Sequence, residues 1–534
     1  MQIGLSLSLT AQLRLSTSAY VVSGFDPALV FDFKSDYYKT GGADTTFSPA
    51  ITHTASTNAT MVDSDGLLKW RPHNRVTSSG DLASTSWSAI RATYDGPTET
   101  LTQVGTTVQG LVTQAPASLT VGARYKYTIR MKAGNTGWGV VAHVMTNAFW
   151  VKAWFDLSNG VVGTVGANTT ATIVNAGDGW WDCSVEAVAN RTVANISAQT
   201  AASDNTTTAA DGDTVLVRQV HAYRSDLGGM VNNPDTNSSY VPTTTTPVYL
   251  SRRGQHLYNG SAWVNEGILH ESEARTNLLL HSGALSTQSA TVAAVANTLS
   301  FTGTGTVTLS GASTAGPLVG TGAGENNRVS LTFTPTAGTL TLAVSGTVTN
   351  AQLEAGATAS SYIPTGFNTA TRAAETLTVP AANLPYSSTN MSIQMDGKMT
   401  YADRGLIREV QFVEWLADTN NGIEQFACSG TGFFPNGAVA FFQEASAATS
   451  LRVTPAATLP FGVNVPFNIS SRHGSTFLNG AVGGTALTAD TTPTALPNLS
   501  STDLNLGSTF MGTIGQFRMW DEDITDAGIT EAST

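Results

Sequence analysis

Hydrophobic and polar residues alternate with a period of two along much of the chain, which is the pattern of half-buried β-strands. The alternating runs are short and separated by frequent turns, and no long amphipathic helix is evident. This spacing favours sandwiches and jelly rolls. The chain is therefore predicted to be all-β, with tandem jelly-roll or β-sandwich modules. The clearest strand is expected at residues 125–132, with its buried face formed by Tyr125, Tyr127, Ile129 and Met131.

A second alternating stretch predicts a β-hairpin at residues 329–344. Two apolar-polar runs, 329–334 and 340–344, flank the turn sequence Pro-Thr-Ala-Gly at 335–338. A glycine near the exit of a short turn between two such runs is a hairpin signal.

Two stretches of the middle region begin and end in the same way, which indicates an internal repeat. Their entries start at Asn74 and Asn277, each shortly after an acidic-Gly-x-Leu motif at 65–68 or 266–269. Their exits read Ser-Ser-Tyr-Val-Pro-Thr at 238–243 and Ser-Ser-Tyr-Ile-Pro-Thr at 360–365. We predict that the two stretches share one strand topology, that the second is a reduced version of the first, and that Tyr240 and Tyr362 are equivalent.

Charge and cysteine content exclude several functional classes. Charged residues make up 12% of the 534 residues, the net charge is −12, and there is no basic stripe, so nucleic acid is not an expected partner. No apolar run of about 18 residues occurs, so membrane insertion is not expected. Residues 1–19 lack a positive start and are interrupted by Arg14, which argues against a cleaved signal peptide. Cys183 and Cys428 are expected to be independent buried thiols.

Several segments resemble structural proteins of tailed bacteriophages and prophages. The entry at 273–280 (EARTNLL and the following Leu) and the exit at 352–365 are similar to modules of those proteins that look like carbohydrate-binding jelly rolls. The Trp-rich pieces 154–160 and 177–183 belong to the same pattern. The closing segment 512–520, followed by 526–529, resembles the laminin G/concanavalin A-like sandwich, and residues 3–10 resemble the N-termini of such phage proteins.

This resemblance implies a division of the chain and a place for it. Residues 1–32 are expected to form an extended, virion-anchoring leader, with Leu5, Leu7 and Leu9 on one apolar face that another chain covers. The remaining segments are a small β lead-in (33–73), a jelly-roll module (74–243, module one), a connector (244–276), a shorter β-sandwich module (277–370, module two) and a laminin G/concanavalin A-like sandwich (371–534). The resemblance implies a protein of the virion surface, a fibre or appendage, in a homo-oligomer for which a trimer is favoured.

No catalytic site is predicted. Asp156, Asp178 and Asp182 could pair as glycosidase carboxylates, but Asp178 lies in an Asp-Gly turn. The eight histidines show no paired ligand spacing, so zinc is not expected. No cofactor is expected beyond a structural calcium ion, whose weak candidate ligands are Asp211, Asp213 and Asp503.

Glycan binding is the favoured chemistry, because sugars stack their C–H faces on aromatic rings and offer hydroxyls to polar side chains. Five of the ten tryptophans lie at residues 138–181 of module one. Trp138 beside Asn135, on the turn at 134–137, is the preferred candidate, because a ring next to a turn reaches solvent more readily than one in mid-strand. The further candidates are Trp150, Trp154 and Trp181, and of the adjacent Trp180 and Trp181 one is expected in the core and one in solvent. The competing interpretation is that these rings are sandwich core.

Two rival functions stay open at this point. One is a decoration protein of the phage head or tail that binds no ligand. The other is a secreted carbohydrate-binding protein of cellular origin, which would need an export signal that residues 1–19 do not supply. Host-surface glycans and other virion proteins are the partners expected for the favoured function.

Overall fold

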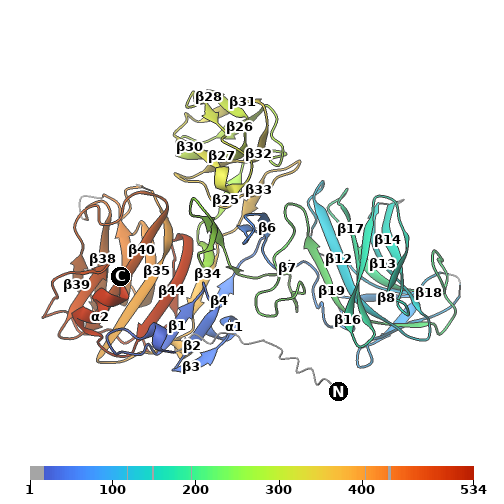
Figure 1. Cartoon of the computed structure of the whole chain (residues 1–534), viewed down its shortest axis with the longest axis horizontal. Coiled ribbons are helices and arrows are strands. Elements are labelled where there is room, and N and C mark those ends of the chain that lie inside the picture. Colours follow the sequence, from blue (N-terminus) through green and yellow to red (C-terminus); the bar gives the residue numbers. More distant parts are fainter. Residues whose placement is uncertain are drawn as a thin grey trace, which may run out of the picture. The chain divides into compact units, whose positions relative to one another are not determined.

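The computed structural model describes residues 17–534 except 107, 117, 147–148, 194, 403 and 431–433. The chain forms two compact units, Met1–Thr52 together with Leu377–Thr534, and His53–Thr376. Apart from two short α-helices and three 3-10 turns, every regular element described is a β-strand, which confirms the predicted all-β, multi-sandwich fold (Figure 1). The predicted leader positions Leu5, Leu7 and Leu9 lie outside the described residues.

Module one is a sandwich of two six-stranded sheets that enclose one core. The first sheet has the order β16-β17-β12-β19-β10-β9, with β16 (Thr170–Gly177), β17 (Trp180–Val188), β12 (Arg124–Ala133), β19 (Thr214–Arg224), β10 (Thr100–Gln103) and β9 (Ala92–Asp95). The second has the order β15-β14-β13-β18-β11-β8, with β15 (Val161–Val165), β14 (Phe149–Asp156), β13 (Trp138–Thr146), β18 (Asn195–Ala201), β11 (Leu111–Gln114) and β8 (Ser88–Ile90). The strand predicted at 125–132 is β12, and its four predicted core residues are each at most 1% exposed.

Module two is a smaller sandwich of the same kind. One sheet has the order β30-β27-β32, with β30 (Val329–Phe333), β27 (Asn297–Gly303) and β32 (Val348–Ala355). The other has the order β26-β31-β28-β29, with β26 (Gln288–Val292), β31 (Gly338–Ser345), β28 (Thr306–Gly311) and β29 (Leu318–Val319).

The two modules share one strand topology. The module-one orders β17-β12-β19 and β14-β13-β18-β11 correspond, in the same chain order, to β30-β27-β32 and β29-β28-β31-β26. Module two lacks counterparts of β8, β9, β10, β15 and β16. The prediction of a repeat with a reduced second copy is confirmed.

The hairpin predicted at 329–344 is wrong. β30 pairs with β27 in one sheet, whereas β31 pairs with β26 and β28 in the other. The turn at 335–338 therefore carries the chain from one sheet across to the facing one. Alternation indicates which face of a strand is buried but not which strand pairs with it. β30 and β31 bury Phe333 and Leu340 in the same core from opposite sheets, and such a pair of strands has the same sequence pattern as a hairpin.

Equivalent hydrogen bonds close both modules around a buried asparagine. Asn277 donates its Nδ2 to the carbonyls of Ala351 and Ile363, and its Oδ1 accepts from the amides of Leu279 and Leu353. The corresponding bonds of Asn74 reach Val220, Val241, Val76 and Ala222. We call each such set an asparagine clasp.

The exit tyrosines complete the equivalence. The hydroxyl of Tyr240 lies 2.8 Å from Ser79 Oγ, and that of Tyr362 lies 2.7 Å from Ser282 Oγ. The repeated motif thus marks the point at which each module's last segment returns to its first, and Tyr240 and Tyr362 occupy equivalent positions, as predicted.

Short strands connect the modules within the His53–Thr376 unit. They are β5 (Thr60–Val62), β6 (Leu68–Trp70), β7 (His73–Asn74), β20 (Val248–Tyr249), β21 (Arg252–Arg253), β22 (His256–Tyr258), β23 (Trp263–Asn265), β24 (Ile268–Glu271), β25 (Arg275–Asn277) and β33 (Ala370–Arg372). β4 (Thr52–Thr54) lies at the boundary between the two units.

These short strands enclose a network of five buried charges. Arg252 contacts Glu271 at 2.7 Å and Glu375 at 2.6 Å, Arg71 contacts Glu375 at 2.8 Å, and Arg372 contacts Glu271 at 3.0 Å. Each of the five side chains is at most 3% exposed. The network therefore links the lead-in, the connector and residues 372–375, directly after module two, in an environment where unpaired charge is costly.

The second unit is a further sandwich. One sheet runs β3-β2-β1-β44-β35-β40-β41-β42, with β3 (Ala43–Thr45), β2 (Tyr37–Thr40), β1 (Leu29–Asp32), β44 (Met511–Trp520), β35 (Asn390–Tyr401), β40 (Gly462–Gly474), β41 (Leu478–Val482) and β42 (Thr485–Ala486). The other includes β39-β38-β37-β36-β43-β34, with β39 (Ala448–Val453), β38 (Ala438–Ala445), β37 (Asn421–Cys428), β36 (Val410–Asp418), β43 (Leu504–Leu506) and β34 (Thr376–Val379). The helical elements of the chain are η1 (Thr17–Tyr20), α1 (Phe47–Ala50), η2 (Glu325–Asn327), η3 (Ala381–Asn383) and α2 (Thr525–Ala532).

Part of the segment assigned to the leader belongs to this sandwich instead. β1 pairs antiparallel with β44, and Leu29, Val30 and Phe31 are completely buried. Tyr20 is 4% exposed and stacks on Tyr37 with the ring centroids 5.2 Å apart. Residues 20–45 thus complete the C-terminal sandwich. The apolar face of β1 is covered only when the C-terminal part of the chain, which contains β44, packs beside it.

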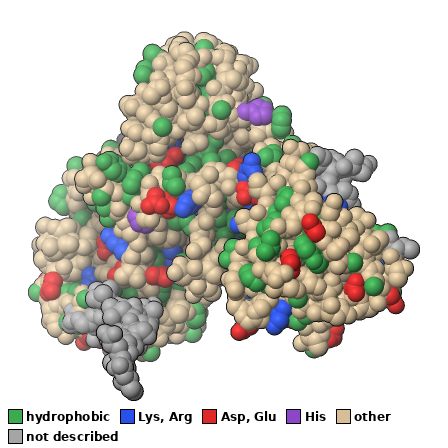
Figure 2. Space-filling model, turned by 45° about the vertical axis from the view of Figure 1, so that its right-hand side comes forward, with side chains coloured by type: hydrophobic (Ala, Val, Ile, Leu, Met, Phe, Trp, Pro, Cys, Tyr) green, Lys and Arg blue, Asp and Glu red, His purple; other side chains and the backbone are tan. Residues whose placement is uncertain are grey.

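Cys183 and Cys428 are both buried free thiols. No helix among the described residues is long and apolar enough to cross a membrane. On the face drawn in Figure 2, charged side chains are sparse and most of the surface is uncharged.

Candidate functional site

Trp154 lies in a buried cluster on the outer face of a module-one sheet. It packs with Val140, Ala142 and Ala201, whereas the neighbouring Val141 points into the main core. Trp154 is 2% exposed and donates its Nε1 to the carbonyl of Thr206 at 2.9 Å. The loop after β18 therefore covers this ring, and Trp154 is not available to a ligand in this conformation.

Trp138 is half-buried at the edge of the same cluster. A Cβ at Gly163 would lie 2.7 Å from its Cζ3, so the indole occupies the space that this glycine leaves free on β15. The turn at 134–137 does bring the ring toward the edge of the sheet, but packing against Gly163 and Trp154 leaves it only partly in solvent.

Asn135 is exposed but its amide is engaged within the fold. Its Nδ2 donates to the carbonyl of Gly212 at 2.9 Å, and its Oδ1 accepts from the amide of Thr214 at 2.6 Å. The side chain thereby attaches the turn at 134–137 to the start of β19. Both polar ends of the amide are used for structure, which leaves little for a sugar hydroxyl.

Neither Trp180 nor Trp181 stands in solvent. Trp181 is partly buried against the main core, donates its Nε1 to the carbonyl of Leu157 at 2.9 Å and fills the space beside Gly160. Trp180 is 6% exposed beneath the guanidinium of Arg218, 4.0 Å from the ring centroid. The side chain of Trp150 lies outside the described residues, and its backbone pairs with Val144.

The carboxylates considered for catalysis or calcium stabilise turns and strands. Asp182 forms a bidentate pair with Arg130, and Asp156 accepts the amides of Ser158 and Asn159. The three calcium candidates each accept a backbone amide, from Gly105 to Asp211, from Ala210 to Asp213 and from Ala381 to Asp503. Among the described residues, no group of three His, Cys, Asp or Glu side chains could hold a metal ion.

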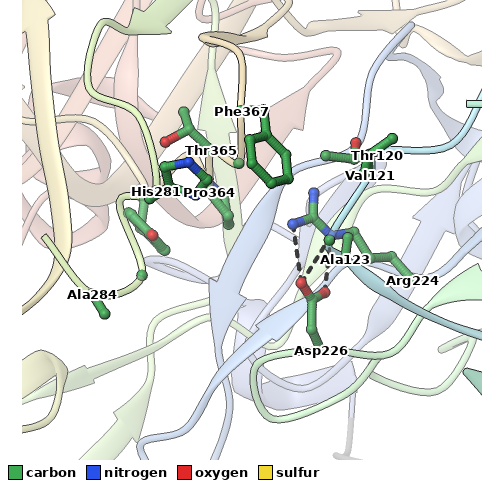
Figure 3. Close-up of a pocket in the computed structure, with 14 residues that line it drawn as sticks. Thr120, Val121, Ala123, Arg224, Asp226, His281, Ala284, Pro364, Thr365 and Phe367 are labelled. Atoms are coloured by element: carbon green, nitrogen blue, oxygen red, sulfur yellow. Dashed lines mark hydrogen bonds and ion pairs between the residues drawn. The ribbon is translucent and has the colours of Figure 1, made fainter. Parts of the chain in front are cut away.

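A pocket of about 380 Å³ lies where module one, through residues 120–123 and the end of β19, meets the entry and exit of module two (Figure 3). The modules approach each other closely here, because a Cβ at Gly366 would lie 3.0 Å from the carbonyl oxygen of Val121. This volume is within the usual range for small-ligand sites. The pocket is lined by Thr120, Val121, Gly122, Ala123, Arg224, Asp226, His281, Gly283, Ala284, Tyr362, Pro364, Thr365, Gly366 and Phe367.

Phe367 presents an exposed aromatic ring to this pocket. It is 62% exposed, the largest such fraction among the large hydrophobic residues described. The imidazole of His281 meets it edge-on, with centroids 4.6 Å apart and planes at 86°. On the module-one side, a Cβ at Gly122 would lie 3.8 Å from the ring, which places the backbone of residue 122 beside Phe367. His281 and the backbone around Gly122 thus flank a flat apolar surface that remains in water.

A preorganised polar pair forms part of the pocket wall. Arg224 contacts both carboxylate oxygens of Asp226, with Nε–Oδ1 at 2.9 Å and Nη2–Oδ2 at 3.0 Å (Figure 3). Asp226 also accepts the indole Nε1 of Trp70 at 2.7 Å, and the Arg224 guanidinium lies 4.3 Å from the centroid of that ring. These contacts hold both charged groups in place, where they can exchange hydrogen bonds with a hydroxyl-rich ligand.

A second, smaller pocket of about 200 Å³ adjoins the first and shares Thr120, Arg224, Tyr362 and Pro364 with it. Its further lining comes from the lead-in and the connector, including Ser56, Asn58 and Tyr249. We call the larger pocket the Phe367 pocket and the smaller one the Tyr249 pocket.

Sequence reasoning missed both pockets. Phe367 follows the repeated exit motif directly, in the stretch Gly-Phe-Asn-Thr at 366–369, where small and polar neighbours break the strand alternation. An isolated aromatic ring in such a turn-like stretch was the available signal. Only the tertiary structure shows that Phe367 lies in the same pocket as residues 120–123 of module one.

Comparisons with known proteins found solved structures that match part of the chain at low identity. No protein-family model matches, and no curated protein matches in sequence. The botulinum neurotoxin serotype D binding domain is 12% identical with a TM-score of 0.23 over 29% of this chain, which spans 39% of the toxin domain. Domain 4 of AbnA, a GH43 extracellular arabinanase of Geobacillus stearothermophilus solved with arabinotriose, is 12% identical (TM-score 0.23, 30% of this chain and 73% of that one). The CBM40 of a Ruminococcus gnavus sialidase, solved with α2,6 sialyllactose, is 10% identical (TM-score 0.23, 28% and 85%).

Proposed function

We propose that this chain is a non-catalytic structural protein of a tailed-phage particle, exposed as a fibre or appendage, that binds host-surface glycans in the Phe367 pocket. The observation that carries the glycan part is the 62% exposed ring of Phe367 beside an ordered Arg224–Asp226 pair. An aromatic surface in water together with convergent polar groups is the combination that a sugar requires.

The physical argument is one of complementary surfaces. A pyranose ring covers an aromatic face with its C–H groups and removes apolar area from water. Its hydroxyls then meet groups that are already held in place, which lowers the entropy lost on binding. The second large aromatic residue of this pocket's lining, Tyr362, offers no alternative, because it is 1% exposed.

The virion part of the proposal rests on the resemblance of the entry, exit and closing segments to phage structural proteins. The leader would attach the chain to other virion proteins, and a homo-oligomer, for which a trimer is favoured, would present several pockets at once. Multivalency of this kind raises a weak single-site affinity by roughly 10²–10⁴.

Phe367→Ala is expected to weaken binding to the best glycan on an array of bacterial O-antigen, capsular and core oligosaccharides by about tenfold, because it removes the stacking surface. The melting temperature should stay nearly unchanged, since substitutions of exposed residues away from special contacts alter stability by about 0.5 kcal/mol or less. Glycan arrays, followed by calorimetric titration of the strongest hit, measure the first effect, and thermal unfolding measures the second.

Trp138→Ala provides the matched control, because Trp138 was the ring preferred from the sequence. Its packing with Trp154 predicts a lowered melting temperature with glycan affinity retained. The opposite pattern, with affinity lost in Trp138→Ala and retained in Phe367→Ala, would move the site to module one. If the wild-type chain binds no glycan on the array, the result favours the alternative function, a decoration protein that binds no ligand.

Deleting residues 2–16 is expected to abolish incorporation into particles while leaving both units folded, because the first buried side chain described is Tyr20. The measurement is quantitative mass spectrometry of purified particles from a host that supplies the truncated chain, with circular dichroism of the isolated protein as the folding check. Normal incorporation of the truncated chain would contradict the anchoring role of the leader.

A further inference from the structure

The Tyr249 pocket adjoins the Phe367 pocket along a shared wall. Thr120, Arg224, Tyr362 and Pro364 line both, so the two pockets lie next to each other. Their volumes are about 380 and 200 Å³. The larger pocket has room for a sugar ring with its substituents, and the smaller one has room for part or all of a second ring.

The Tyr249 pocket also contains a ring that a sugar could contact. Tyr249 is half-buried, whereas the other aromatic residues of its lining, Trp70, Tyr125 and Tyr362, are at most 2% exposed. The Tyr249 ring lies nearly parallel to the imidazole of buried His73, with planes at 14° and centroids 6.1 Å apart. Its backbone pairs with His73 through β20 and β7, so the position of the ring is set by the fold.

Charge in the Phe367 pocket indicates the class of sugar. Its arginine, Arg224, already contacts both oxygens of Asp226, and the two charges cancel. An acidic sugar placed there would meet the Asp226 carboxylate and would compete for a guanidinium that is already satisfied. A neutral sugar uses the remaining hydrogen-bonding capacity of the pair without separating it.

We infer that the two pockets are consecutive subsites for an oligosaccharide of at least two rings, with a neutral ring on Phe367 and the next ring beside Tyr249, where Arg75 also lines the wall. This inference rests on the proposed glycan-binding function and adds to it the length of the ligand and the charge of its ring on Phe367. The same glycan chain would contact the lead-in, module one, the connector and module two, since residues from all four segments line the two pockets.

The test compares a monosaccharide, a disaccharide and a trisaccharide cut from the strongest neutral glycan on the array, titrated against the full chain. The disaccharide should bind about tenfold more tightly than the monosaccharide, because a second ring contact is added. Tyr249→Ala should remove most of that gain and leave the monosaccharide affinity unchanged, while Phe367→Ala should weaken all three ligands. Raising the salt concentration from about 0.05 M to about 0.5 M should alter the monosaccharide affinity by less than about twofold, because the charges of Arg224 and Asp226 cancel in the Phe367 pocket.

A second variant covers the case in which Tyr249→Ala unfolds. Ser56 is exposed and lines only the Tyr249 pocket, so Ser56→Trp should fill that pocket and remove the disaccharide gain without deleting a buried contact. Equal affinities for the monosaccharide and the disaccharide in the wild-type chain would overturn the second subsite. A strict preference for acidic monosaccharides would overturn the assignment of a neutral ring to the Phe367 pocket. Both results leave glycan binding itself intact, whereas an absence of any binding defeats the proposed function instead.

Discussion

Arg252→Met is expected to lower the free energy of unfolding of the His53–Thr376 unit by about 3–5 kcal/mol, because it leaves two buried carboxylates without their shared cation. Arg252 is completely buried and contacts both Glu271 and Glu375. It also donates to the carbonyl of Thr60 at 3.1 Å and to Ser361 Oγ at 3.0 Å. Methionine retains the apolar volume of the side chain, so the loss reports on charge and hydrogen bonding more than on a cavity.

Arg130→Met is the matched control. Arg130 forms an equally short bidentate pair with Asp182, but the two side chains are 23% and 31% exposed. Solvent screens such a pair, and its loss is expected to cost about 1 kcal/mol or less. Urea unfolding of the full chain, followed by hydrogen exchange to identify the unit that opens, measures both variants. Equal effects of the two substitutions would show that the buried network contributes no more than a surface pair.

The same network predicts how the difference in unfolding free energy between wild type and Arg252→Met depends on pH. Burial alone raises the pKa of Glu271, but the guanidinium groups of Arg372 and Arg252 lower it from 4.5 to about 2. Burial likewise raises the pKa of Glu375, and Arg252 and Arg71 bring it well below its usual range. Because the folded pKa values lie below the unfolded ones, this stabilisation is complete above about pH 4.5 and is lost as the pH falls toward 2. The difference in unfolding free energy between wild type and Arg252→Met should therefore shrink as the pH is lowered from about 5 to about 3, the range in which free carboxyl groups titrate.

Asn277→Ala is expected to destabilise module two by roughly 4 kcal/mol, because it leaves two carbonyls and two amides without partners at a buried position. Asn277 is completely buried in the folded state, and its four hydrogen bonds are between 2.9 and 3.1 Å long. Since Asn74 makes the equivalent four bonds in module one, Asn74→Ala should cost a similar amount there. Hydrogen exchange resolved by module is the suitable measurement, because the chain does not unfold as a single domain.

Asn175→Ala serves as the control for the clasp variants. Asn175 is exposed and its Oδ1 accepts one amide, that of Gly177 at 2.8 Å, so its loss should cost about 1 kcal/mol or less. If Asn277→Ala opened module two no more than Asn175→Ala opens module one, the clasp would not be the element that closes the module. If Asn74→Ala and Asn277→Ala differed greatly, the two clasps would not be energetically equivalent.

Local pattern was enough to predict many individual elements. The alternation at 125–132 identified β12 and the residues that it buries, since a period of two assigns alternate residues to one face. The repeated entry and exit motifs identified two copies of one sandwich, because each motif contains the residues that close a module, from Asn74 to Tyr240 and from Asn277 to Tyr362. The pattern did not identify strand partners, as the mistaken hairpin at 329–344 shows.

The candidate site was beyond the reach of the sequence for a physical reason. Tryptophan content pointed to module one, yet a ring contributes to binding only where it stays in water, and burial of Trp154 under residues 202–206 depends on where a loop folds back. The Phe367 pocket needs residues 120–123 and 224–226 of one module beside residues 281–284 and 362–367 of another.

The sequence by itself thus determined the β-sandwich modules, the repeat and the scarcity of charge, because these follow from periodicity, motif and composition within short stretches. Only the tertiary structure decided that β1 completes the C-terminal sandwich, that Arg71, Arg252, Glu271, Arg372 and Glu375 form one network, and that Phe367 faces a pocket. Each of these depends on the distance between groups far apart in the chain and on the exclusion of water around them. Distance and solvent exclusion set the strength of an ion pair or a stacking surface, and both arise only when the chain has folded.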